Sequence, residues 1–169
     1  DAPRDGSPGS DRPREEAVVI DRRARALIAG SEQCRLAAYQ DSVGVWTIGW
    51  GRAHGARPDD TCTQEQADQW FGEDIAEAEA AVAKYVMRPL NAAQHGALVS
   101  LVYNVGPRAL TGKDDDPDGS TLLQAVNAGH HFAAAQAFVA YFLAGGKPLR
   151  GLLIRRLEEA LLYASEPWP

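Results

Sequence analysis

Residues 32–51, EQCRLAAYQDSVGVWTIGWG, carry the strongest fold signal of this 169-residue chain. In the second half of the stretch, residue character alternates with a period of two, as it does along a β-strand. The residues of one parity are large and apolar: Trp46, Ile48 and Trp50. Thr47 has the opposite parity, and Asp41 and Gly44 mark a tight turn in front of this strand. The stretch predicts a short β-hairpin, and a loop rich in Gly, Pro and Asp follows it over 51–61.

The rest of the chain has the periodicity and the end signals of helices. Two capping boxes stand out, Thr63 with Gln66 and Asn91 with Gln94, and each predicts a helix start. Glycine residues at the ends of apolar stripes predict several helix ends. The expected helices cover about 17–30, 63–87, 91–106, 120–129, 131–144 and 150–164. The sequence therefore predicts an α+β fold that is mostly helical, with one small sheet after the first helix.

Composition limits the classes of function. The chain carries 17 Lys and Arg against 23 Asp and Glu, a net charge of -6. An acidic balance argues against nucleic-acid binding and against attraction to anionic membranes. No apolar run reaches about 18 residues, so no membrane-spanning helix is expected. Residues 1–16 are rich in Pro, Gly and charge and predict a flexible tail or linker, which leaves 17–169 as one folded domain.

Three polar residues around the hairpin have the chemistry of a hydrolytic site. Glu32 follows the first helix, Asp41 lies at the hairpin turn, and Thr47 would point into a cleft if the Trp46 face packs inward. A protonated and an ionised carboxyl facing each other are the minimum equipment for glycoside hydrolysis, and a hydroxyl can hold the water. The same residues also fit a surface Glu, a turn Asp and an ordinary strand Thr.

The surrounding motif decides between these interpretations. Residues 32–51 resemble the pattern E-G-x-R-L-x-A-Y-x-D-x-x-G-x-W-T-I-G-Y-G of the phage-type lysozymes, glycoside hydrolase family 24. Residues 98–106, LVSLVYNVG, resemble the family segment L-V-S-F-x-F-N-V-G. Residues 151–159, GLLIRRLEE, resemble its G-L-x-x-R-R-x-x-E helix. Together with a similar segment at 120–129, the likeness extends over about residues 17–165.

The resemblance implies a lysozyme-like fold, in which a long helix joins a small β-hairpin lobe to a larger helical lobe. It implies that Glu32 is the general acid, that Asp41 is the base of an inverting reaction, and that Thr47 positions the attacking water. The resemblance also implies substrate-binding or supporting roles for four residues: Tyr39, Asn104, Arg155 and Arg156. For the two arginines we expect one structural ion pair, with the other arginine facing water, and whether that pair includes Glu32 stays open.

The chain departs from the family pattern at two places beside the site. Gln33 replaces the glycine after the catalytic glutamate, and Arg52 replaces a histidine that commonly follows the hairpin motif. A structural contact between that histidine and an acid is therefore expected to be missing. Both departures bear on the rate of the reaction more than on its type.

The two cysteines, Cys34 and Cys62, leave two alternatives open: one disulfide, or two unbridged thiols. None of the four histidines has the spacing of a zinc site, so no metal and no cofactor is expected. The segment KDDDPDG at 113–119 does not fit a calcium loop and predicts a solvated insertion.

The predicted function is a muramidase, which cleaves the β-1,4 bond between N-acetylmuramic acid and N-acetylglucosamine in bacterial peptidoglycan. We expect a monomeric phage endolysin that acts in the periplasm or outside the cell after removal of a start region. The alternatives are a catalytically weak domain that binds glycan as a scaffold, a secreted antibacterial effector with the same chemistry, and a transglycosylase.

Overall fold

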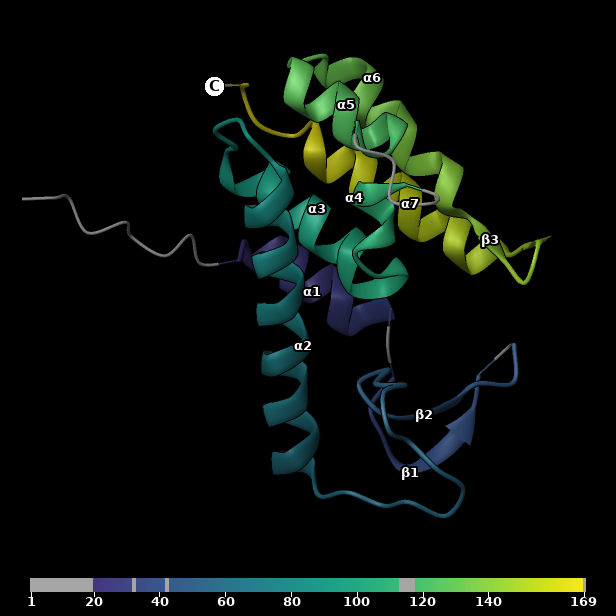
Figure 1. Cartoon of the computed structure of the whole chain (residues 1–169). Coiled ribbons are helices and arrows are strands. Elements are labelled where there is room, and N and C mark those ends of the chain that lie inside the picture. Colours follow the sequence, from purple (N-terminus) through teal and green to yellow (C-terminus); the bar gives the residue numbers. More distant parts are fainter. Residues whose placement is uncertain (1–19, 32, 42, 113–117, 169) are drawn as a thin grey trace, which may run out of the picture.

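A computed structural model of the chain describes residues 20–31, 33–41, 43–112 and 118–168. A small β lobe lies at one end and a larger helical lobe at the other, and the long helix α2 (Gln64–Tyr85) runs between them (Figure 1). This arrangement confirms the predicted α+β class. The predicted tail over 1–16 lies outside the described residues and stays a prediction.

The β lobe is built on the predicted hairpin. Strand β1 (Arg35–Gln40) pairs antiparallel with β2 (Trp46–Gly49), and Tyr39 lies opposite Thr47 in the register. The loop before α2 lines the other edge of β1, where the amide of Cys62 donates to the carbonyl of Leu36 at 2.9 Å. The edge of β1 is thus covered by the chain itself.

Both predicted capping boxes are present. Thr63 accepts from the amide of Gln66 while the Gln66 side chain accepts from the amide of Thr63, and α2 starts there. Asn91 and Gln94 make the same reciprocal pair at the start of α3 (Ala92–Val105). Each box satisfies two amides that a helix start leaves without partners, which is why these starts could be predicted from a few residues.

Helix α3 is the centre of the helical lobe. It packs against α1 (Arg22–Ser31), α2 and α7 (Arg150–Tyr163), and nine of its residues are buried. Gly96 lies at the contact between α3 and α1. A Cβ added there would come within 2.6 Å of the Cβ of Ala24, so the two helices can pack this closely only with glycine at this position. Helices α4 (Arg108–Thr111), α5 (Thr121–Ala128) and α6 (His131–Ala137) complete the lobe.

The C-terminal third differs from the prediction. The expected helix over 131–144 stops at the end of α6 and continues as a 3-10 turn, η1 (Phe138–Tyr141). Strand β3 (Leu143–Ala144) then pairs with β4 (Lys147–Pro148), a second sheet that the sequence did not predict. The reason is the pair Gly145 and Gly146, which both have positive φ and make a tight turn that joins the two strands.

Two other helix predictions need correction. The first helix begins at Arg22 and not near residue 17, since Asp21 accepts from the amide of Arg23 at 2.6 Å, as a capping residue does. Helix α4 was not predicted, because it is a single turn. None of the described helices is long and apolar enough to cross a bilayer.

His131 is held in one tautomer by the capping box of α3. The Gln94 side-chain oxygen accepts from the Asn91 amide, so its Nε2 faces His131 Nδ1 at 3.1 Å. An amide nitrogen only donates, so Nδ1 must accept and the ring proton lies on Nε2. The ring stacks on Trp168 with centroids 4.8 Å apart. Burial, followed by the charge of Arg88, lowers the pKa of His131.

Stability is therefore expected to fall on acidification. The pKa of His131 is lower in the folded than in the unfolded chain, so the unfolded chain takes up more protons as pH falls through about 6.5. Its contribution is complete above that pH and is lost below it. Urea unfolding between pH 7.5 and 5 measures this, and His131→Gln should show a shallower dependence than the parent. His130→Gln, at the exposed neighbouring residue, should keep the parent's slope; equal slopes for all three proteins would contradict the assignment.

Candidate active site

Asp41 occupies the turn of the first hairpin, as predicted. Its Oδ1 accepts from the amides of Val43 and Val45 at 2.9 and 2.8 Å, and its own amide donates to the carbonyl of Val45. These contacts fix the orientation of the carboxylate relative to the hairpin. Within the part of the chain that the structure describes, the second oxygen, Oδ2, makes no hydrogen bond. The turn therefore orients the carboxylate through Oδ1 and leaves Oδ2 available for another hydrogen bond.

Thr47 lies on β2 but does not open to solvent as expected. Its side chain and that of Ile48, on the opposite parity, are each only 4% exposed. Alternation along a strand separates buried from exposed side chains only where one face of the strand contacts solvent. Both faces of this short strand are covered. The Thr47 hydroxyl donates to the carbonyl of Val45 at 3.2 Å, so its oxygen retains lone pairs that can accept a hydrogen bond.

The hairpin gathers three of the predicted site residues. Tyr39 faces Thr47 across the two strands, Asp41 follows within two residues, and the guanidinium of Arg35 lies over the Tyr39 ring at 4.2 Å. Glu32, the predicted general acid, lies outside the described residues. In the chain it falls between the last residue of α1 and the first residue of β1, and its role stays a prediction.

Arg155 and Arg156 belong to one buried cluster in the helical lobe. Both contact Oε1 of Glu159, at 3.2 Å from Arg155 Nε and 2.8 Å from Arg156 Nη2. The Ser100 hydroxyl donates to the same oxygen at 2.7 Å. Their exposed fractions are 4% and 0%, so the prediction that one arginine faces water is wrong. The Glu159 carboxylate gives both buried guanidinium groups an ion-pair partner.

The ionisation of this cluster is set by two opposing effects. Burial raises the pKa of Glu159, whereas the two arginines and the Ser100 hydroxyl lower it. Burial lowers the pKa of Arg156 against the pull of Glu159. Because three donors converge on Oε1, the ionised carboxylate fits this geometry. Oε2 of Glu159 and two nitrogens of Arg156 are buried without a hydrogen-bond partner among the described residues.

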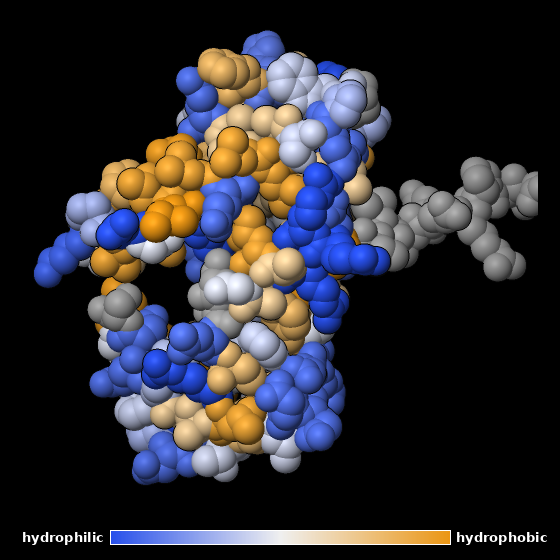
Figure 2. Space-filling view, turned by 180° about the vertical axis from the view of Figure 1, so that it is seen from behind, coloured by the Kyte–Doolittle hydropathy of each residue, from blue (hydrophilic) through white to orange (hydrophobic). Residues whose placement is uncertain are grey.

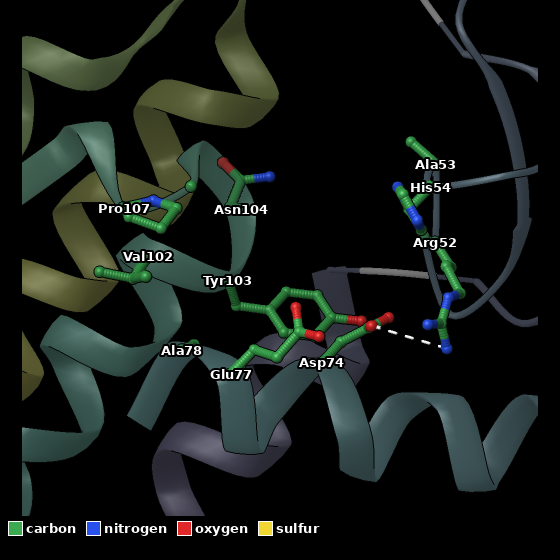
Figure 3. Close-up of a pocket in the computed structure, with 12 residues that line it drawn as sticks. Arg52, Ala53, His54, Asp74, Glu77, Ala78, Val102, Tyr103, Asn104 and Pro107 are labelled. Carbon is green, nitrogen blue, oxygen red and sulfur yellow. Dashed lines mark ion pairs between the residues drawn. The ribbon is translucent and has the colours of Figure 1, made fainter. Parts of the chain in front are cut away.

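A cavity of about 290 Å³ lies between the two lobes (Figure 3). Its β-lobe wall comes from the segment after β2, with Arg52 and His54, and its helical wall from the end of α3, with Tyr103 and Asn104. The middle of α2 supplies a third side. Asn104, one of the predicted supporting residues, thus faces the space between the lobes.

Arg52 contacts two acidic residues beside this cavity. Its Nη1 lies 3.1 Å from Glu73 and 3.7 Å from Asp74, both on α2. The expected loss of a contact between the family histidine and an acid is not contradicted, because Arg52 stands at this position and its guanidinium makes an acid contact of its own. Burial raises the pKa of Asp74, and Arg52 opposes that rise. Glu77 lines the same cavity one turn further along α2.

Sequence reasoning missed these cavity residues. Asp74 and Glu77 lie within the helix predicted over 63–87, but they were not singled out from the sequence as site residues. Their spacing of three residues, which places both on one side of a helix, was the available signal. Nothing in the sequence indicated that the hairpin segment would fold back over that side.

Cys34 and Cys62 are free thiols in this structure. Cys34 Sγ lies 3.7 Å from Oε1 and 3.6 Å from Nε2 of Gln64, and the pKa of Cys62 is raised by burial and by the proximity of Cys34. Among the described residues, no group of three His, Cys, Asp or Glu side chains is placed to hold a metal ion.

A hairpin lobe and a helical lobe that are joined by a long helix, with a cavity between them, define the lysozyme class of α+β folds. The chain belongs to the phage lysozyme family, whose family model matches residues 29–159.

Similar proteins support the assignment. An endolysin of Acyrthosiphon pisum secondary endosymbiont phage 1 is 38% identical over 150 residues, which cover 86% of this chain and 98% of that protein. The active form of the P1 phage endolysin Lyz superposes with a TM-score of 0.76 at 25% identity, over 86% of this chain and 85% of that one. The muramidase domain of SpmX from Asticaccaulis excentricus gives a TM-score of 0.71 at 33% identity, over 86% and 97%.

Proposed function

We propose that this protein is a muramidase that hydrolyses the β-1,4 bond between N-acetylmuramic acid and N-acetylglucosamine in peptidoglycan, as a phage endolysin in host lysis. One observation carries the proposal. In a chain of the phage lysozyme family, Asp41 and Thr47 lie on one hairpin, and two turn amides hold the carboxylate of Asp41 in place. The names of the similar endolysins and of the muramidase domain agree with this chemistry.

In the proposed reaction, the protonated Glu32 carboxyl gives its proton to the glycosidic oxygen as the bond to the anomeric carbon breaks. Asp41 takes a proton from a water molecule, and the resulting oxygen attacks the anomeric carbon from the opposite face. Thr47, whose hydroxyl already donates to Val45, can accept a hydrogen bond from that water. One water is consumed for each bond, and no metal or cofactor enters the reaction.

Product analysis in H₂¹⁸O tests the type of reaction. Purified peptidoglycan is incubated with the full chain, and the released muropeptides are analysed by mass spectrometry. Hydrolysis places one ¹⁸O at the reducing end of each muramic acid. A transglycosylase would instead leave 1,6-anhydro ends without label. Binding to the polymer without release of fragments would overturn the enzyme proposal and support the scaffold alternative.

The inverting course is tested separately. NMR of the first products should show the α-anomer at the new reducing end before mutarotation, because an inverting enzyme attacks the β-linked carbon from the other face. A β-anomer as the first product would rule out Asp41 as the general base of an inverting reaction.

A further inference from the structure

The two lobes meet at the base of the cavity through a tyrosine hydroxyl. Tyr103, near the end of α3, donates to the carbonyl of Trp50 at 2.7 Å. Trp50 belongs to the β lobe and lies directly after β2. In Figure 3 the side chain of Tyr103 extends from the helical wall between α2 and the hairpin segment. The hydrogen bond thus joins the two walls of the cavity at its floor.

The receiving carbonyl lies at the tip of a rigid turn. Ile48 and Arg52 exchange two backbone hydrogen bonds, of 2.9 and 3.0 Å, and so close a loop over residues 49–51. Gly49 and Gly51 have φ of +64° and +96°, a conformation that glycine adopts without strain. The position of the Trp50 carbonyl is therefore coupled to β2, the strand that carries Thr47.

Trp50 is also held from a second side. Its indole N–H donates to Asp68 of α2 at 2.7 Å, and its ring packs on Phe71 with centroids 5.5 Å apart. Phe71 in turn meets the Tyr103 ring edge-on at 5.8 Å. The rings supply apolar contact that a phenylalanine at residue 103 would preserve, whereas only the hydroxyl supplies the directional bond to the β lobe.

At the opposite rim, the two lobes approach each other. Cγ1 of Val43, at the hairpin turn, lies 3.7 Å from the position that a Cβ on Gly145 would take, in the turn between β3 and β4. Figure 2 shows a hollow between the helical lobe and the β lobe.

From this geometry we propose that Tyr103 is a positioning residue: its hydroxyl holds the turn at Trp50 against α3 and so keeps the hairpin that carries Asp41 and Thr47 in register with the helical lobe. The proposal rests on the proposed muramidase function for its catalytic consequence. The family segment quoted above has phenylalanine at this position, so the restraint is a property of this chain's own tyrosine.

Tyr103→Phe tests the proposal, with Tyr141→Phe as the matched control. Tyr141 also donates to a backbone carbonyl, that of Ala109 at 2.9 Å, but both residues lie within the helical lobe. Spin labels are introduced as non-natural amino acids at the exposed residues Arg57 and Glu158, so the two cysteines stay unchanged. The distance between the two labels reports the distance between the lobes in the absence of substrate. We expect a broader distance distribution for Tyr103→Phe and the parent's distribution for Tyr141→Phe.

The kinetic readout separates positioning from general stability. Loss of one hydrogen bond that orients the site should lower kcat about three- to tenfold in Tyr103→Phe, with KM within about twofold of the parent. Tyr141→Phe should keep the parent's kcat and KM. An unchanged distance distribution in Tyr103→Phe, or equal losses of kcat in both variants, would overturn the proposal. If neither variant nor parent turns over peptidoglycan, the muramidase proposal fails, and the distance distributions alone still decide whether Tyr103 restrains the lobes.

Discussion

Glu32→Gln is expected to lower kcat for peptidoglycan hydrolysis by at least about a hundredfold, since a positioned general acid contributes roughly 10²–10⁴ in rate. Glutamine preserves the size of the side chain and its ability to hydrogen-bond, but its amide cannot give a proton to the leaving oxygen. The measurement is release of muropeptides from purified peptidoglycan under single-turnover and steady-state conditions, at equal concentrations of folded protein.

Two further variants are measured beside Glu32→Gln. Glu65→Gln changes an exposed glutamate in the first turn of α2 and should retain the parent's rate. Gln33→Gly restores the glycine of the family pattern beside the acid and should raise the rate if the glutamine side chain hinders it. Should Glu32→Gln release muropeptides as fast as the parent, the acid is another group and the assignment of Glu32 is wrong.

Glu159→Leu is expected to destabilise the fold by about 3–5 kcal/mol, the cost of leaving a buried charge without its partner. Both Arg155 and Arg156 bind Oε1 of Glu159, and the carboxylate is fully buried. Removal of the anion leaves two guanidinium groups in a site closed to water. For a domain of this size, the loss corresponds to a fall of roughly 10 °C in the melting temperature.

Urea unfolding of Glu159→Leu, Glu159→Gln and Glu158→Gln measures this effect. Glu159→Gln keeps an acceptor for Ser100 and should lose less than Glu159→Leu. Glu158 lies on the same helix but is exposed, so Glu158→Gln should stay within about 0.5 kcal/mol of the parent. Parent-like stability of Glu159→Gln would mean that the carboxyl is protonated in the folded protein.

Much of the fold followed from signals that act over a few residues. The capping boxes at Thr63 and Asn91 bond reciprocally within four residues, and the turn at Asp41 is closed by its own side chain. Such interactions hardly depend on the rest of the molecule, so the hairpin and the starts of α2 and α3 were predicted correctly. The predicted helix over 131–144 was wrong because its end is decided by the strand pairing around Gly145 and Gly146.

The amino-acid sequence by itself determined the α+β class, because that class depends on periodicity and helix caps. The two-lobed plan and the residues of the proposed site were implied by the resemblance of a contiguous motif to the phage-type lysozymes. Tertiary structure alone decided that Thr47 is buried, that both arginines share Glu159, and that Arg52 and Tyr103 face α2 and the hairpin across the cavity. The physical reason is sequence distance. The contacts of Thr63 and Asp41 lie within four residues, whereas Tyr103 meets Trp50 across 53 residues and Ser100 meets Glu159 across 59.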